Sequence, residues 1–499
     1  MKRTVFFLFL IFLSSGIFAQ NPVQKYVEQL KTTDELKEAV WGVRAVKVSG
    51  EVIADWNSSR RMIPASNLKL LTTGIALNEL GSSHRFKTRL AYSGTIEGST
   101  LKGDLYIVGG GDPTIGGRDG ISTPLQATFS QWAKLLRSAG ITSIEGRVIG
   151  DGRWLDCEMQ NPSWQMEDAA TGDGTVMTGL SFAEGLQYFT LTPGAKPGAP
   201  VKVEVSYPET PWMTWSHSCT TGAAGSKENL LYTSTPLAPL AGLSGSMPAG
   251  SRSKRQSFAN NFGAMTCAFY FYRYLESSGF NVSEGPADID PFGNVRDFSD
   301  EPCAAAVAQT KLRFIGETLS PTVSDIVRMA NVHSDNYYAE TLLRVLAKER
   351  TGSACKDSCT AVMLRAFKAM KVAGAERMQF DDGCGLSRKN YVSPDFFVRF
   401  LMAMRSSAQS ASFEKSIPQA GTGTLSTRLQ RESEETRARV HMKSGSMNGV
   451  RCFSGYIMPR SGRPEDVIVF SFMTNNTIAA SSRMNFIIDK IAGLLADEN

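Results

Sequence analysis

The chain changes character twice along its length. Residues 83–299 consist of short runs of alternating polar and apolar residues between Gly- and Pro-rich turns, whereas the flanking segments place apolar residues at helical spacing. Helical periodicity is clear over 320–350, and three strand patterns and a closing helix end the chain. We therefore expect one α/β domain built from residues 20–82 and 300–499, with 83–299 inserted as a β-rich region. Such an insertion is tolerated where two chain ends lie close together at a surface loop.

The first nineteen residues have the pattern of a cleaved secretory signal peptide. Lys2 and Arg3 precede an apolar run that ends near Phe18, and the small residue Ala19 follows. The run is short for a membrane span, and no run of eighteen apolar residues occurs later in the sequence. We therefore expect an exported protein that has no integral membrane span once residues 1–19 are removed.

Charge and metal-ligand content exclude two classes of partner. The net charge of the whole chain is +5, and it falls to +3 when Lys2 and Arg3 leave with the signal peptide. This near-balance gives no support to a nucleic-acid partner. Eight cysteines are present, but their spacing specifies no disulfide framework, and Cys355 and Cys359 lack a second pair of ligands at zinc spacing. We expect neither a metal site nor a cofactor.

A serine and a lysine three residues apart open a predicted helix. Ser66 and Lys69 precede an apolar stripe, and Gly81 provides a helix stop signal. The spacing places both side chains on one face and directs unpaired backbone N–H groups toward the serine. The same spacing recurs in predicted turns and loops at Ser99/Lys102, Ser251/Lys254, Ser353/Lys356 and Ser412/Lys415. Only the first pair has the structural setting that nucleophilic catalysis requires.

Two further motifs follow at a distance. Ser334 and Asn336 flank Asp335 at a predicted helix start, and Lys443-Ser444-Gly445 lies on a predicted strand. Alone, the serine at 334 would be interpreted as a helix N-cap, and the second motif as a strand end and turn. In this order, Ser-x-x-Lys, Ser-x-Asn and Lys-Ser/Thr-Gly form the triplet of penicillin-recognising serine enzymes.

The resemblance extends beyond the triplet. It covers the chain from about residue 35 to the end, and the segments that carry it include "GDLYIVGGGDPTI" (103–115), "SPTVSDIVRMANVHSDNYYAETLLRVL" (320–346), "DDGCGLSRKNYVSP" (381–394) and "KSGSMNGVRCFSGY" (443–456). Together they resemble the D-alanyl-D-alanine carboxypeptidase/endopeptidase family, the class C low-molecular-mass penicillin-binding proteins. The resemblance implies a β-lactamase/transpeptidase-like α/β (α+β) domain, split between its first and second motifs by two nested β-rich domains. We place the inner one at roughly 155–240.

The resemblance also implies how the first two motifs act. Ser66 would be the nucleophile and Lys69 its base, which requires an uncharged lysine. Burial and the neighbouring cation of Lys443 would lower the pKa of Lys69. Ser334 would relay the proton between the two lysines and the leaving amine, while Asn336 would hold the substrate amide.

The third motif would bind the end of the substrate. Lys443 and Ser444 would bind its terminal carboxylate, and Gly445 would leave room for its backbone along the strand edge. The backbone N–H groups of Ser66 and Ser446 would form the oxyanion hole.

Two residues depart from the family pattern. Ser444 stands where the family usually has Thr, a change that keeps the hydroxyl. Cys384 stands where a serine is usual, and its thiol could be oxidised or pair with Cys452. His333 and His441 adjoin the motifs, and we expect structural roles for both.

The implied activity is that of a periplasmic serine D-Ala-D-Ala carboxypeptidase/endopeptidase of the bacterial envelope. Its partners would be peptidoglycan stem peptides and β-lactams, and whether it forms a homodimer stays open. Two alternatives also stay open: a β-lactamase, which would release the opened antibiotic quickly, and a non-catalytic peptidoglycan-binding scaffold, which would release no product.

Overall fold

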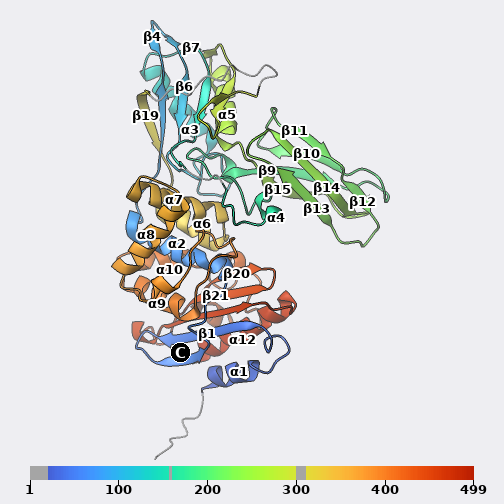
Figure 1. Ribbon diagram of the computed structural model, residues 1–499, viewed down its shortest axis with the longest axis vertical. Helices are drawn as coiled ribbons and strands as arrows, with labels where there is room; N and C mark the ends of the chain where they lie inside the picture. Colours follow the sequence, from blue (N-terminus) through green and yellow to red (C-terminus); the bar gives the residue numbers. More distant parts are fainter. Residues whose placement is uncertain (1–20, 157–159, 299–310, 499) are drawn as a thin grey trace, which may run out of the picture.

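The computed structural model describes residues 21–156, 160–298 and 311–498, so the predicted signal peptide lies outside the described residues. Figure 1 shows that both ends of the chain form the lower half of the molecule and the middle of the chain forms the upper half. A separate β-rich unit projects to one side. Among the described residues, no helix is both long and apolar enough to span a membrane.

The lower half is built on a five-stranded antiparallel sheet in the order β2-β1-β22-β21-β20. Strands β1 and β2 are consecutive and pair as an antiparallel hairpin. Strand β22 lies at the centre and is buried at every position, because helices cover both faces of the sheet. The strands are β1 (Val40–Lys47), β2 (Val52–Trp56), β20 (Val440–Met447), β21 (Val450–Ile457) and β22 (Ile468–Asn475).

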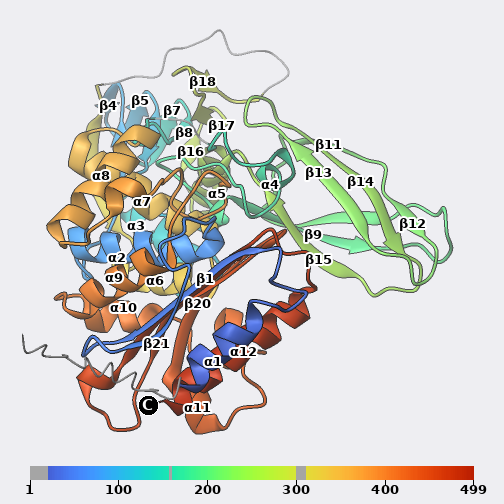
Figure 2. The same cartoon turned by 60° about the horizontal axis from the view of Figure 1, so that its bottom comes forward.

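Helices from distant parts of the sequence form the two covering layers (Figure 2). One layer consists of α1 (Pro22–Leu30), α11 (Glu434–Arg439) and α12 (Ser481–Asp497). The other consists of α2 (Leu68–Leu80), α6 (Val323–Val332), α7 (Asn336–Thr351), α8 (Lys356–Ala369), α9 (Pro394–Arg405) and α10 (Ser410–Ser416). Each layer encloses its own apolar core against the sheet, and the second layer carries the first two motifs. The sandwich is the expected α/β domain.

The upper half contains a six-stranded sheet in the order β18-β17-β8-β6-β3-β19 and a four-stranded sheet in the order β16-β7-β5-β4. Its helices are α3 (Leu125–Ser138) and α5 (Gly263–Ser277). Its strands are β3 (Lys87–Tyr92), β4 (Thr95–Glu97), β5 (Thr100–Lys102), β6 (Leu105–Val108), β7 (Ser143–Glu145), β8 (Val148–Asp151), β16 (Asn281–Val282), β17 (Pro286–Ile289), β18 (Val295–Arg296) and β19 (Arg313–Leu319).

Strand β19 changes where the insertion ends. It pairs with β3, the first strand of the inserted region, so the chain leaves this region only after Leu319. The sequence had placed the boundary near residue 300, because a local strand pattern does not reveal a partner more than two hundred residues away. We propose residues 21–82 and 320–498 as the two parts of the catalytic domain.

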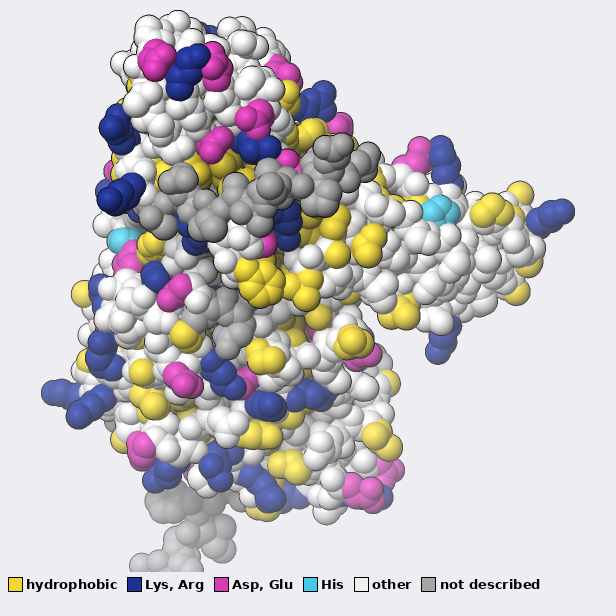
Figure 3. Space-filling model, turned by 45° about the horizontal axis from the view of Figure 1, so that its top comes forward, with side chains coloured by type: hydrophobic (Ala, Val, Ile, Leu, Met, Phe, Trp, Pro, Cys, Tyr) yellow, Lys and Arg dark blue, Asp and Glu magenta, His cyan; other side chains and the backbone are white. Residues whose placement is uncertain are grey.

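The projecting unit consists of two small sheets. One contains β9 (Leu186–Thr192), β10 (Lys202–Tyr207) and β15 (Lys254–Ala259), and the other contains β11 (Thr214–His217), β12 (Thr220–Gly222), β13 (Asn229–Ser234) and β14 (Leu240–Pro248). Their shared core includes the stacked rings of Tyr232 and Phe258, whose centroids are 4.3 Å apart. In Figure 3 this unit stands clear of the rest, and most of its visible surface carries no charge. It extends about twenty residues beyond the predicted end at 240, since β15 pairs with β9.

Candidate active site

Ser66 lies in a single 3-10 turn, Ala65–Asn67, directly before α2. The predicted helix start is thereby confirmed, with Gly81 ending the helix at a φ of 90°. Ala65 has a left-handed backbone, with a φ of 47°, a conformation that non-glycine residues rarely adopt. Strain of this kind often marks a functional site, and here it immediately precedes the predicted nucleophile.

Lys69 is fully buried beneath Ser66. Its Nζ donates to Ser66 Oγ at 3.0 Å, to Asn336 Oδ1 at 2.6 Å and to the Cys384 carbonyl at 2.8 Å. Burial lowers the pKa of Lys69, while the nearby Asp382 carboxylate acts in the opposite direction. The amine is therefore within one hydrogen bond of the serine oxygen and inclined toward the neutral form that a base requires.

Lys443 is a second fully buried lysine, on β20. Its Nζ donates to Ser334 Oγ at 2.9 Å and to the Ser444 carbonyl at 2.7 Å. Burial and, next, the cation of Lys69 lower the pKa of Lys443 well below its ordinary value. The sequence expectation assigned part of the shift at Lys69 to Lys443. Burial lowers the pKa of both lysines, and repulsion between two neighbouring cations favours the loss of one of the two charges.

In the second motif, one residue caps a helix and its neighbour contacts a lysine of the site. Asp335 caps α7, because its Oδ1 accepts from the backbone N–H of Tyr338 at 2.8 Å. Ser334 is left outside the helix with a φ of 60°, and its hydroxyl is free to meet Lys443. The alternative interpretation of Ser334 as an N-cap is therefore wrong. Asn336 begins the helix and bridges Lys69 to the inserted region, since its Nδ2 donates to the Asp173 carbonyl at 2.9 Å.

The third motif forms one edge of the site. Ser444 Oγ donates to Thr424 Oγ1 at 3.3 Å, and Ser446 is exposed. Gly445 packs against the turn that carries Ser66. A Cβ there would lie 2.6 Å from the Pro64 carbonyl oxygen and 2.8 Å from the Asn67 nitrogen, so this glycine lets the strand pack against the nucleophile's turn.

These groups meet at an open cavity of about 420 Å³. Five predicted residues line it: Ser66, Ser334, Asn336, Ser444 and Ser446. The other three, Lys69, Lys443 and Gly445, are buried beside it. All eight predicted residues are thus brought together from three segments that are distant in sequence.

Other lining residues were not identified from the sequence. The catalytic domain contributes Thr424 and Arg388 among others, and the inserted region contributes one polar wall made of Gln165, Glu167, Asp168 and Asp173. Arg388 joins the two sides, because its Nε donates to Gln165 Oε1 at 3.0 Å. Arg388 falls within segment 381–394, which carries the family resemblance, whereas the wall from the inserted region gave no motif.

Two cysteines and two histidines near the motifs were singled out in the sequence, and the structure places each of them. Cys384 and Cys452 are both free and fully buried, so the pairing between them is not formed. Burial raises the pKa of the Cys384 thiol well above its ordinary value, which keeps it in its unreactive protonated form. His333 lines the cavity. His441 contacts the Ala438 carbonyl at 3.2 Å instead.

In this α/β sandwich, the buried Lys69 contacts Ser66, and the buried Lys443 contacts Ser334 at the same open cavity. This arrangement defines the class of penicillin-recognising serine peptidases. A family model described as the D-Ala-D-Ala carboxypeptidase 3 (S13) family matches residues 23–497, and the chain belongs to this family. It is accordingly a serine-type D-alanyl-D-alanine carboxypeptidase.

Relatives and solved structures agree with this membership. The chain is 29% identical to the D-alanyl-D-alanine carboxypeptidase of Actinomadura sp. (strain R39), over 88% of this chain and 78% of that relative. It is 22% identical to the D-alanyl-D-alanine carboxypeptidase DacB of Haemophilus influenzae, over 84% and 82%. The crystal structure of penicillin binding protein 4 (dacB) from Haemophilus influenzae superposes with a TM-score of 0.76 at 20% identity, covering 95% of this chain and 98% of that one.

Proposed function

We propose that Ser66 attacks the carbonyl of the penultimate D-Ala of a peptidoglycan stem peptide and forms an acyl-enzyme. The contact that carries this proposal is the 3.0 Å hydrogen bond between Ser66 Oγ and the Nζ of fully buried Lys69. A neutral Lys69 takes the serine proton as the Oγ–carbon bond forms. Water then hydrolyses the ester and releases the shortened peptide.

The remaining motif residues complete the reaction. The backbone N–H groups of Ser66 and Ser446 stabilise the oxyanion of the tetrahedral intermediate. Ser334, bonded to Lys443, delivers the proton to the leaving D-Ala amine. Lys443 and Ser444 bind the terminal carboxylate of the substrate.

The same chemistry extends to cross-linked peptides and to β-lactams. The cavity is open, which fits a cross-linked peptide as well as a free end. A solved structure of penicillin binding protein 4 from Haemophilus influenzae is described as complexed with a novel β-lactam, which supports acylation of this chain's serine by such compounds. We also propose that residues 1–19 are removed on export and that the mature protein acts in the periplasm.

A fluorescent penicillin tests the nucleophile. Labelling is expected for the wild-type protein and absent for Ser66→Ala, while label on the alanine variant would refute the assignment.

Digestion of purified sacculi, followed by chromatography of the released muropeptides, tests the substrate. Fast release of opened penicillin would favour a β-lactamase instead, and binding to sacculi without product would favour a scaffold.

A further inference from the structure

We infer that Asp382 is a positioning residue for Lys69, and that Trp164 of the inserted region fixes Asp382 in the orientation this role requires. The inference rests on the role proposed above for Lys69. Because Lys69 donates to the Cys384 carbonyl at 2.8 Å, the place of that carbonyl decides where the amine sits relative to Ser66. A residue that fixes the position of this carbonyl therefore also helps to position the Lys69 amine.

One carboxylate organises the loop around Cys384. One oxygen of Asp382 accepts from the Gly385 backbone N–H and from the Asn390 side-chain amide, each at 2.8 Å. The other accepts from the Ser387 backbone N–H at 2.6 Å. Asp382 is only 3% exposed, and hydrogen bonds to a desolvated carboxylate are among the strong ones. The loop closes on this side chain, which fixes the path of the backbone at Cys384.

The loop is also tied to both helices that carry the first two motifs. The Gly383 carbonyl accepts from Thr72 Oγ1 on α2 at 2.7 Å, and the Gly383 N–H donates to Glu340 Oε2 on α7 at 2.6 Å. A Cβ on Gly385 would lie 1.9 Å from the Ala65 carbonyl oxygen, so the loop backbone lies directly against the nucleophile's turn. A shift of the loop would therefore be felt at the serine and at its base.

The inserted region contacts this loop from the other side. Trp164 Nε1 donates to Asp382 Oδ2 at 2.9 Å, in a buried contact. Asn161 Nδ2 donates to the Asp381 carbonyl at 2.8 Å, and Ser163 Oγ donates to the Asp381 carboxylate. Three side chains of one short inserted segment, Asn161, Ser163 and Trp164, thus donate hydrogen bonds to two adjacent residues of the loop.

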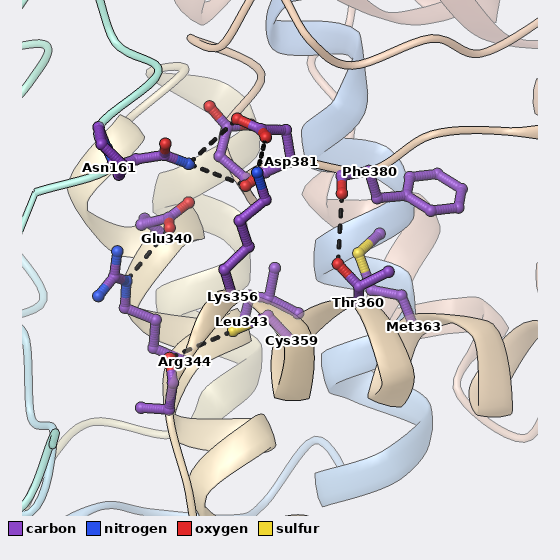
Figure 4. A pocket seen from close by; sticks show the side chains of 13 residues that line it. Asn161, Glu340, Leu343, Arg344, Lys356, Cys359, Thr360, Met363, Phe380 and Asp381 are labelled. Atoms are coloured by element: carbon purple, nitrogen blue, oxygen red, sulfur yellow. Dashed lines mark hydrogen bonds and ion pairs between the residues drawn. The ribbon is translucent and has the colours of Figure 1, made fainter. Parts of the chain in front are cut away.

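The space behind the loop is closely filled. Figure 4 shows Asn161 and Lys356 meeting Asp381, while Arg344 Nε donates to Glu340. The cavity among these side chains is only about 20 Å³. That volume holds roughly one water molecule, so the loop has little room to move backward.

A metal site is the rival interpretation of the same residues. Glu340, Asp382 and Cys384 place potential ligand atoms within 4.8 Å of one another, and all three are buried. However, Glu340 already accepts from Gly383 N–H and pairs with Arg344, and both oxygens of Asp382 accept from protein donors. A cation would have to displace these donors, so the geometry favours a hydrogen-bond centre.

Trp164→Phe tests the inference with the least disturbance, because it removes the N–H and keeps most of the ring. Trp132→Phe is the matched control, since it removes an N–H that donates to Thr318 Oγ1 at 3.0 Å in the inserted region, away from the site. Acylation by fluorescent penicillin is followed at several concentrations. We expect a rate constant about tenfold lower in Trp164→Phe with unchanged penicillin affinity, and an effect below about twofold in the control. Equal rates in the two variants would overturn the inference.

Asp382→Asn adds a readout that a purely structural role would not change. The Asp382 charge raises the pKa of Lys69 against the effect of burial, and so do the carboxylates of Asp335 and Asp173. Removing the charge should lower that pKa and move the acidic limb of the acylation rate to lower pH.

A slower rate with an unmoved limb would mean that the loop is merely destabilised. If Asp382→Asn does not fold, the comparison of the two tryptophan variants decides. Absence of labelling in the wild-type protein would instead refute the proposed function, so the two failures are distinguishable.

Discussion

The two sides of the cavity are built in different ways. On the catalytic-domain side, Lys69 and Lys443 are fully buried and each holds a serine hydroxyl at the surface of the cavity. On the inserted side, Glu167 and Asp173 are exposed, and Asp173 contacts the first side through its backbone carbonyl rather than its charge. The buried side sets proton positions and the exposed side sets the charge that an approaching ligand meets. We therefore expect substitutions on the first side to change the rate of the acylation step, and those on the second side to change how fast a ligand associates.

Lys69→Arg should give the largest effect among the variants that separate the two sides. Arginine keeps the cation but stays protonated over the working pH range, so it cannot take the serine proton. We expect acylation by penicillin to fall about a thousandfold. In the wild type the rate should rise as pH passes upward through the pKa of Lys69, which burial places below its ordinary 10.5.

Rates measured from pH 5 to 10 check this prediction. The arginine variant should show no recovery at alkaline pH. Activity within about tenfold of the wild type would show that the neutral amine is not the base.

Gly445→Ala comes next, because it acts on the packing between the third motif and the nucleophile. The added Cβ would lie 2.6 Å from the Pro64 carbonyl oxygen, which belongs to backbone and yields little. We expect acylation to fall about ten- to a hundredfold, with a lower midpoint of thermal unfolding.

Gly285→Ala is the matched control for that change. Nothing lies within 4 Å of its added methyl, and its backbone does not require glycine. The control should label at the wild-type rate. If Gly445→Ala also labels normally, the strand edge tolerates movement and the turn does not depend on it.

On the buried side, the first motif follows from local geometry, whereas the pairing of Ser334 with Lys443 was expected only from the family resemblance. Ser66 and Lys69 are one helical turn apart, so helix geometry alone places them together. The helix cap was not predicted. Asp335 caps α7, and the left-handed backbone at Ser334 leaves the Ser334 hydroxyl outside the helix, where it contacts Lys443.

The exposed side and the domain boundaries could not be predicted in this way. The segment 160–175 contains only one short helix, α4 (Met166–Ala169). Its position depends on the contact between Trp164 and Asp382, which are more than two hundred residues apart. Strand β19 was missed for the same reason, since its partner β3 begins the insertion. The contact of Gly445 with the nucleophile's turn could not be predicted, because a glycine in a strand has two faces and the sequence does not say which one is crowded.

The smallest effect should come from the exposed wall. Glu167→Gln combined with Asp168→Asn removes two negative charges from the cavity lining and leaves the buried lysines untouched. Penicillin carries a carboxylate, so the second-order rate constant for acylation should rise by about twofold at low salt and return to the wild-type value at high salt. Glu97→Gln, on β4 at the far end of the inserted region, removes a charge away from the site and should change nothing. A lower maximal rate in the double variant would contradict the division between the two sides, because it would mean that the wall takes part in the chemistry itself.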